Sequence, residues 1–126
     1  MTERKNPDFS DVSPEAGGPA IDWAHLARQT MGDVELEREL LALFATQAGA
    51  FGGRLAAAGA DKERRDLAHT LKGAARAIGA FSLGQAAEEY ESAVATVEAP
   101  DRLRALDARL HETQQAIAAR LAQGRG

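Results

Sequence analysis

The pattern of hydrophobic and polar positions predicts four long amphipathic helices, preceded by a short helix that carries Trp23 and Leu26. At 34–58 the large apolar residues fall largely along one stripe: Val34, Leu36, Leu40, Leu41, Leu43, Phe44 and Phe51. The same spacing predicts three further long helices, at roughly 62–78, 83–97 and 100–122.

Residues with strong preferences for helix ends mark these boundaries. The expected N-terminal caps are three aspartates and a serine: Asp22, Asp33, Asp61 and Ser82. Gly79 is well placed to end the helix at 62–78, because glycine readily adopts the left-handed conformation of a C-terminal cap. Pro100 suits the first turn of the last helix, where its missing N–H costs nothing.

Short connections between long helices favour antiparallel neighbours. We therefore predict an all-α fold, an antiparallel up-down four-helix bundle with a short additional N-terminal helix. Residues 1–20 contain three prolines among polar residues and are predicted to form a flexible tail. The folded domain is expected to span 21–123.

Composition agrees with closely packed helices and argues against several classes of function. The chain has 126 residues, enough for one domain, with 44% hydrophobic but only 5% aromatic residues. The net charge of −4 argues against a general nucleic-acid binder, and the absence of cysteine excludes disulfides and thiolate metal sites. No apolar run is judged long enough to span a membrane, and no signal-peptide core is evident. We expect a cytoplasmic protein.

The most specific polar pattern lies in the helix at 62–78. At about 100° of rotation per residue, an apolar stripe lies opposite His69; it comprises Leu67, Leu71, Ala74 and Ile78. Four cationic residues and a glycine fall within about 60° of His69: Lys62, Arg65, Lys72, Gly73 and Arg76. His69 is therefore expected to project into solvent from a basic strip on a rigid helix.

These residue types suit a histidine that accepts a phosphoryl group. The attacking group must be a neutral imidazole, and histidine changes charge near neutral pH. Lys72 and Arg76 would favour the neutral ring and attract phosphoryl oxygens. Gly73 leaves space for the active site of a second protein. Asp66 is a candidate to accept a hydrogen bond from one ring nitrogen, which would leave the other nitrogen free to attack.

The segment that begins at His69 resembles the signature of histidine-containing phosphotransfer (HPt) domains. That signature is His-x-Leu-Lys-Gly, two small residues, two variable positions, an aliphatic residue and glycine. The matching residues are His69, Leu71, Lys72, Gly73, Ala74, Ala75, Ile78 and Gly79. The resemblance extends from about residue 22 to 122 and is sharp only over 69–91.

The resemblance implies roles for three of these residues and supports the predicted fold. His69 would be the phosphoacceptor, Lys72 the cation that stabilises the phosphoryl group, and Gly73 the clearance for a partner. Arg76 is added from helix geometry, as a further residue for phosphoryl binding or partner docking. On the next helix, Tyr90-Glu91 replaces the leucine-glutamate pair common in such domains, and Gln85 is present without a role that can be assigned.

HPt domains exchange a phosphoryl group reversibly with the aspartate of a receiver domain, which supplies the magnesium ion. The resemblance therefore implies a carrier that is not an enzyme and has no ATP site or cofactor of its own. The expected partners are receiver domains of response regulators, a hybrid histidine kinase, or both. We expect a monomer that binds neither nucleic acid nor membrane.

Three alternatives remain open at this point. A histidine-kinase dimerisation domain usually has an acidic residue after its histidine and a proline soon afterwards, whereas Thr70 follows His69 and no proline lies between residues 20 and 99. A helical interaction module could keep the fold without phosphotransfer. A metal site is disfavoured because His25, His69 and His111 lack the spacing of a ligand set, and we interpret His25 and His111 as surface residues.

Overall fold

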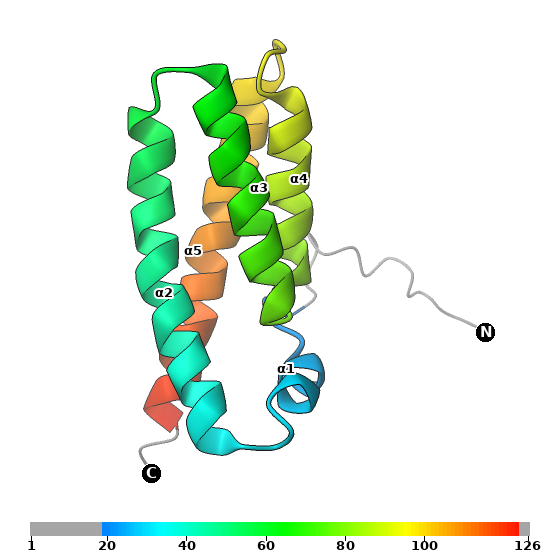
Figure 1. Ribbon diagram of the computed structural model, residues 1–126, viewed down its shortest axis with the longest axis vertical. Coiled ribbons are helices and arrows are strands. Elements are labelled where there is room, and N and C mark those ends of the chain that lie inside the picture. Colours follow the sequence, from blue (N-terminus) through cyan, green and yellow to red (C-terminus); the bar gives the residue numbers. More distant parts are fainter. Residues whose placement is uncertain (1–18, 124–126) are drawn as a thin grey trace, which may run out of the picture.

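The computed structural model describes residues 19–123, and within this range it contains α-helices and no strand (Figure 1). The five helices are α1 (Trp23–Gln29), α2 (Val34–Ala57), α3 (Asp61–Ala77), α4 (Phe81–Ala93) and α5 (Ala99–Gln123). The all-α prediction is confirmed. Most of the predicted N-terminal tail, residues 1–18, lies outside the described residues.

The four long helices lie side by side, and the chain reverses direction from each to the next (Figure 1). Contacts far apart in the sequence show that α2 and α5 run antiparallel. Arg38, near the start of α2, donates a hydrogen bond to the Leu121 carbonyl at 2.9 Å. Further along α2, the Ala45 carbonyl accepts a hydrogen bond from Gln114, at 3.5 Å. The short helix α1 lies at the end of the bundle where α3 ends.

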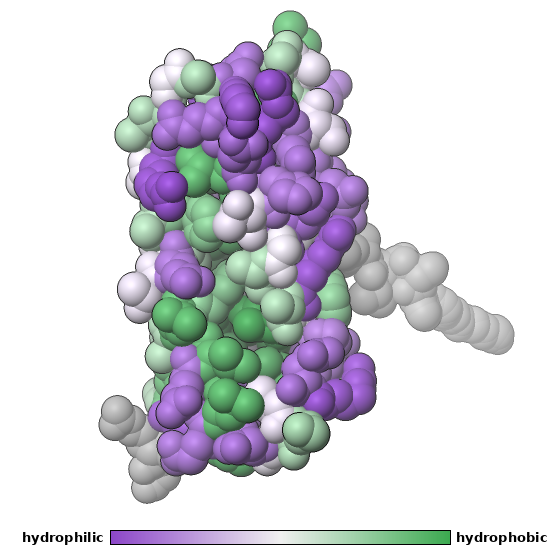
Figure 2. Space-filling model, viewed as in Figure 1, coloured by the Kyte–Doolittle hydropathy of each residue, from purple (hydrophilic) through white to green (hydrophobic). Residues whose placement is uncertain are grey.

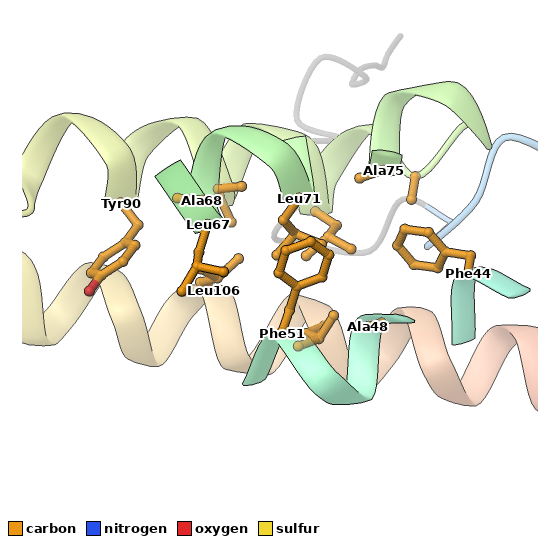
Figure 3. Packing of buried hydrophobic residues seen from close by; sticks show 14 of the residues in the cluster. Phe44, Ala48, Phe51, Leu67, Ala68, Leu71, Ala75, Tyr90 and Leu106 are labelled. Carbon is orange, nitrogen blue, oxygen red and sulfur yellow. The ribbon is translucent and has the colours of Figure 1, made fainter. Parts of the chain in front are cut away.

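The core is a single cluster of buried apolar residues contributed by all five helices. Figure 3 shows Phe51 of α2 pointing toward Leu71 of α3, with Leu106 of α5 and then Tyr90 of α4 further along the bundle. Burial of each large side chain contributes about 1.5–3 kcal/mol. Buried small residues allow α3 and α4 to approach closely, namely Ala68, Ala75, Ala86 and Ala87. This close packing sets the register that brings side chains of α4 to the exposed side of α3.

Two of the predicted N-terminal caps are confirmed. Asp22 accepts a hydrogen bond from the His25 backbone N–H at 3.0 Å, and Asp33 accepts one from Leu36 at 3.1 Å. Each aspartate therefore satisfies a backbone donor that the first turn of its helix would otherwise leave unpaired.

The caps predicted at Asp61 and Ser82 are wrong, because both helices begin earlier. Their N-caps are Ala60 and Ala80, neither of which makes a side-chain cap. Asp61 lies in the first turn of α3, where the helix dipole stabilises a negative charge without a capping geometry. Ser82 is already the second residue of α4, because the turn at the end of α3 leads directly into the next helix.

Gly79 ends α3, as predicted, and also holds the segment that precedes α1. Its φ of +86° is in the left-handed region. The Ala80 N–H bonds the Ala75 carbonyl at 2.8 Å and the Gly79 N–H bonds the Arg76 carbonyl at 3.1 Å, the two bonds of a Schellman motif. The Gly79 carbonyl then accepts a hydrogen bond from the Asp22 N–H at 2.8 Å.

The helix predicted at 83–97 ends earlier, at Ala93, and residues 94–98 form turns. Thr96 explains part of this early end. Its hydroxyl donates to the Ala93 carbonyl at 2.8 Å and accepts from the Glu98 N–H at 3.1 Å. A short polar side chain of this kind competes with helical backbone bonds.

The expectation that no apolar run is long enough to span a membrane is wrong for α2. By length and composition alone, it is long and apolar enough to cross a membrane. In the bundle the same helix supplies several core residues, including Leu41, Phe44, Phe51 and Leu55. A core helix of a bundle passes this test as readily as a membrane span, so one such helix is weak evidence for a membrane protein.

Candidate functional site

His69 lies at the middle of α3, on the side that faces solvent. Its side chain is 66% exposed, whereas the adjacent Ala68 and the nearby Leu71 are fully buried. The apolar side of α3 thus anchors the helix in the core and leaves the imidazole accessible. This is the orientation that the hydrophobic pattern predicts.

A carboxylate from the neighbouring helix holds the His69 ring. Glu91 of α4 places Oε2 3.2 Å from His69 Nδ1. Because an ionised carboxylate can only accept hydrogen bonds, this contact requires the hydrogen of the neutral ring to be on Nδ1. The other nitrogen, Nε2, then keeps its lone pair and is the nucleophilic atom.

The same carboxylate also pairs with Lys72. Glu91 Oε1 lies 3.6 Å from Lys72 Nζ, and the side chains are only 25% and 19% exposed. We call His69, Lys72 and Glu91 the acceptor cluster. Partial burial of the lysine and the glutamate lowers the effective dielectric around them, so their charges act on the ring more strongly than charges in bulk water would.

Sequence reasoning did not assign Glu91 to the site, although a signal for it exists. His69 and Glu91 are equally distant in sequence from Ala80, in the short connection between α3 and α4. In an antiparallel helical hairpin, residues at equal distances from the turn lie at the same level. A carboxylate at this position was therefore a candidate partner of the histidine.

Gly73 lies one turn beyond His69, and nothing within the protein requires a glycine there. A Cβ atom added at this position would meet no atom within 4 Å. A glycine inside a helix costs about 1 kcal/mol relative to alanine, so its presence is not explained by stability. The surface beside His69 is open at this point.

Arg76 is directed toward α4 and away from His69. Its Nη2 donates to Glu88 Oε1 at 2.7 Å, and its side chain crosses Gly84, where an added Cβ would lie 3.0 Å from Arg76 Cγ. Arg76 lies seven positions after His69 along the helix, a rise of about 10 Å. The structure does not bring Arg76 together with the acceptor cluster.

Asp66 also differs from its predicted role. Its carboxylate accepts a hydrogen bond from Lys62 at 2.8 Å, and this bond is the main reason why the pKa of Asp66 is lowered. The hydrogen-bond partner of the His69 ring is Glu91 instead. The basic strip is also less positive than the sequence indicates, because Lys62, Lys72 and Arg76 each pair with a carboxylate.

Gln85 lies away from the acceptor cluster. Its amide donates to Glu89 at 3.0 Å, and it lies six positions before Glu91 on α4, a rise of about 9 Å. The structure therefore provides no reason to assign Gln85 a contact with His69.

A groove of about 500 Å³ lies between α2 and α3, and its lining includes Thr70, which follows His69 on α3, but not His69 itself. Its apolar part includes Phe51 and Leu67, and its polar lining includes Arg54, Asp66 and Thr70. Figure 2, seen from the same side as Figure 1, shows further apolar surface over α2 and α3 in its lower half. This face combines hydrophobic and charged groups, as protein docking surfaces do.

The residues around His69 do not fit a metal site. Within residues 19–123, no group of three or more histidine, aspartate or glutamate side chains is arranged to hold a metal ion. The carboxylate that contacts His69 is already shared with Lys72.

Comparisons with known proteins agree with this geometry. A family model described as the Hpt domain matches residues 29–123, which include all four long helices. The crystal structure of the histidine phosphotransferase ShpA from Caulobacter crescentus is similar to this chain, with 32% sequence identity and a TM-score of 0.69. The similarity covers 84% of this chain and 94% of that chain. No curated protein sequence matches this chain.

Proposed function

Because this chain belongs to the Hpt domain family, we propose that it is a phosphorelay carrier whose phosphoacceptor is His69. The observation that carries the proposal is the geometry of the ring. The imidazole is exposed, and Nδ1 is engaged by Glu91, which leaves Nε2 available to attack. A nucleophile on a rigid helix with a fixed tautomer is well prepared for an in-line displacement.

The proposed step is a direct transfer between two proteins. Nε2 attacks the phosphorus of a phosphoaspartate, and a nitrogen–phosphorus bond forms as the phosphorus–oxygen bond breaks. The electron pair of the broken bond goes to the departing aspartate carboxylate. Delivery to an acceptor aspartate is the reverse of this step. The family does not generally catalyse reactions of its own, and we propose that this chain is a carrier without an ATP site.

Lys72 is the residue best placed to stabilise the transferred group. It lies one turn from His69 on the same helix, is mostly buried, and is held by Glu91 at 3.6 Å. An ammonium group near the transferred oxygens lowers the energy of the charge that develops on them. We propose that Lys72 provides this stabilisation and that the open surface at Gly73 admits the partner. Arg76 is too far along the helix for the phosphoryl group, and we assign it to the edge of the docking surface.

Hpt domains interact with receiver domains and histidine kinases, so the proposed partners are receiver domains of response regulators or of a hybrid kinase. The magnesium ion of the reaction would then be bound by the receiver. Four long helices within one chain form the bundle, which disfavours a kinase dimerisation domain. We expect the carrier to act in the cytoplasm as a monomer.

The test is phosphoryl transfer from a panel of phosphorylated receiver domains to this protein. We expect acid-labile, base-stable label on the wild type and none on His69→Gln. His111→Gln is the matched control, because His111 is an exposed helical histidine on α5. Label that persists in His69→Gln would refute the assignment. A wild-type protein that no receiver labels, although it is folded and binds receivers, would indicate an interaction module.

A further inference from the structure

The Glu91 carboxylate restricts where the proton of the His69 ring can lie, which a neutral side chain would not do. Both of its oxygens are acceptors, with Oε2 3.2 Å from His69 Nδ1 and Oε1 3.6 Å from Lys72 Nζ. A glutamine in the same place could turn its amide and either accept from Nδ1–H or donate to a bare Nδ1. The carboxylate can only accept, so it favours the ring with its proton on Nδ1.

This condition has a consequence once Nε2 carries a phosphoryl group. A ring with phosphorus on one nitrogen and a proton on the other is a cation. If Nδ1 lost that proton, its lone pair would face a carboxylate oxygen at about hydrogen-bond distance, with no hydrogen between two acceptors. The pairing of the cationic ring with Glu91 avoids this repulsion.

Other charges near the ring must also be considered. On α3 itself these charges belong to Arg65, Lys72 and Asp66. The charge of Asp66 is largely compensated by its ion pair with Lys62. Helix α2 contributes Arg54 across the groove. Glu91 is the charged group in contact with Nδ1, so we take it to decide where the proton lies.

We propose that Glu91 keeps the proton on Nδ1 after phosphorylation, so that phospho-His69 persists in its cationic, readily transferred form. This inference builds on the proposed function. When the bond between Nε2 and phosphorus breaks, Nε2 keeps the electron pair and Nδ1 keeps its proton, so a neutral imidazole departs without any proton transfer. The phosphorus forms its new bond to an acceptor aspartate oxygen or, in hydrolysis, to water. The chain therefore passes phosphoryl groups on quickly and stores them poorly.

The test measures the lifetime of phospho-His69 in the absence of any partner protein. The protein is phosphorylated with phosphoramidate, a small phosphoryl donor, and loss of the group is followed from acidic to alkaline pH. At about pH 8, where a free imidazole is neutral, we expect Glu91→Gln to keep the phosphoryl group about tenfold longer than the wild type, the factor that a charge-assisted hydrogen bond supplies. Glu88→Gln is the control, because Glu88 lies on the same helix and pairs with Arg76. It should behave like the wild type.

Glu91→Gln also removes the ion-pair partner of Lys72, which could itself change the lifetime of phospho-His69. The dependence of the lifetime on pH separates that change from the effect of the Nδ1 proton. At about pH 5 the solvent protonates the ring in both proteins, so their rates of loss should converge. A lifetime in Glu91→Gln that equals or falls below the wild-type value at about pH 8 would overturn the proposal. So would a tenfold difference that is constant across the pH range.

A second measurement requires no phosphorylation. Nitrogen-15 NMR of the His69 imidazole should show the Nδ1–H tautomer in the wild type and a mixture in Glu91→Gln. Wild-type protein with its ring proton on Nε2 would refute the inference. If these results hold but no receiver accepts the group, the proposed relay function fails while the role of Glu91 stands.

Discussion

Replacement of Gly73 by alanine should stabilise the fold and at the same time slow phosphoryl transfer. Alanine is favoured over glycine inside a helix by about 0.5–1 kcal/mol, because glycine loses more backbone entropy on folding. The new methyl group meets no atom within 4 Å, so no clash offsets this gain. For a domain of this size, the gain corresponds to an increase in Tm of about 2–5 °C.

The loss of function has a different origin, which lies in the partner. The methyl group would occupy the open surface one turn from His69, where we propose that the receiver approaches. We expect the second-order rate of transfer from a phosphorylated receiver to fall at least about tenfold, equivalent to about 1.4 kcal/mol in the transition state. Urea unfolding followed by circular dichroism gives the stability, and rapid quenching gives the transfer rate.

Gly53→Ala is the matched control. Gly53 is also an exposed helical glycine with no atom within 4 Å of an added Cβ, but it belongs to α2. It should show the same stabilisation and an unchanged transfer rate. A loss of stability in Gly73→Ala would show that the space around Gly73 is not open. Stabilisation together with a wild-type transfer rate would refute the clearance role alone.

Further predictions concern the packing of the bundle and the surroundings of His69. Gly79→Ala should destabilise the protein by about 2–4 kcal/mol in urea unfolding, because φ is +86° and the new Cβ would lie 2.8 Å from the Asp22 carbonyl oxygen; a loss below about 1 kcal/mol would contradict this. Arg120→Ala should lower the free energy of unfolding by about 2–3 kcal/mol in the same assay, because it leaves the mostly buried Glu37 without its partner at 3.1 Å. The double variant Arg120→Ala, Glu37→Gln should recover part of this loss. Asp66→Asn should leave the transfer rate within about twofold of the wild type, since a different carboxylate holds the ring. The pKa of Asp66 is lowered from 3.8, so the stability from its ion pair is present above about pH 4 and lost as the pH falls; acid titration of Asp66→Asn should lack this contribution, and an unchanged acid profile would refute it.

The sequence predicted what depends on a single helix. The apolar stripe of α3 is a local pattern, and it correctly placed His69 in solvent opposite Leu71. The caps at Asp22 and Asp33 were also recognisable, because each side chain bonds a backbone N–H three residues ahead. The cap predicted at Asp61 was wrong by one position, since an aspartate in the first turn satisfies the helix dipole equally well.

What depends on two helices was harder to predict. A helical projection places Arg76 near His69 in angle but ignores the rise of about 10 Å between them, and it contains no information about Glu88 on α4. The partnership of His69 with Glu91 requires the register and the rotation of α4 against α3. These are set by the packing of small buried residues, a property of the pair of helices and not of either sequence pattern.

The three-residue connection between α3 and α4 has a consequence for the order in which this protein assembles. It places the whole acceptor cluster within one helical hairpin, where contacting residues such as His69 and Glu91 are 22 positions apart. The contact of Arg120 with Glu37, in contrast, closes a loop of 83 positions. Because closing a short loop costs less entropy, the hairpin is expected to form before α5 docks on α2. Amide protons of α3 and α4 next to the cluster should then exchange slowly even when the ends of α1 and α5 open. Changes in the outer helices would lower the stability of the bundle before they altered the reactivity of its histidine.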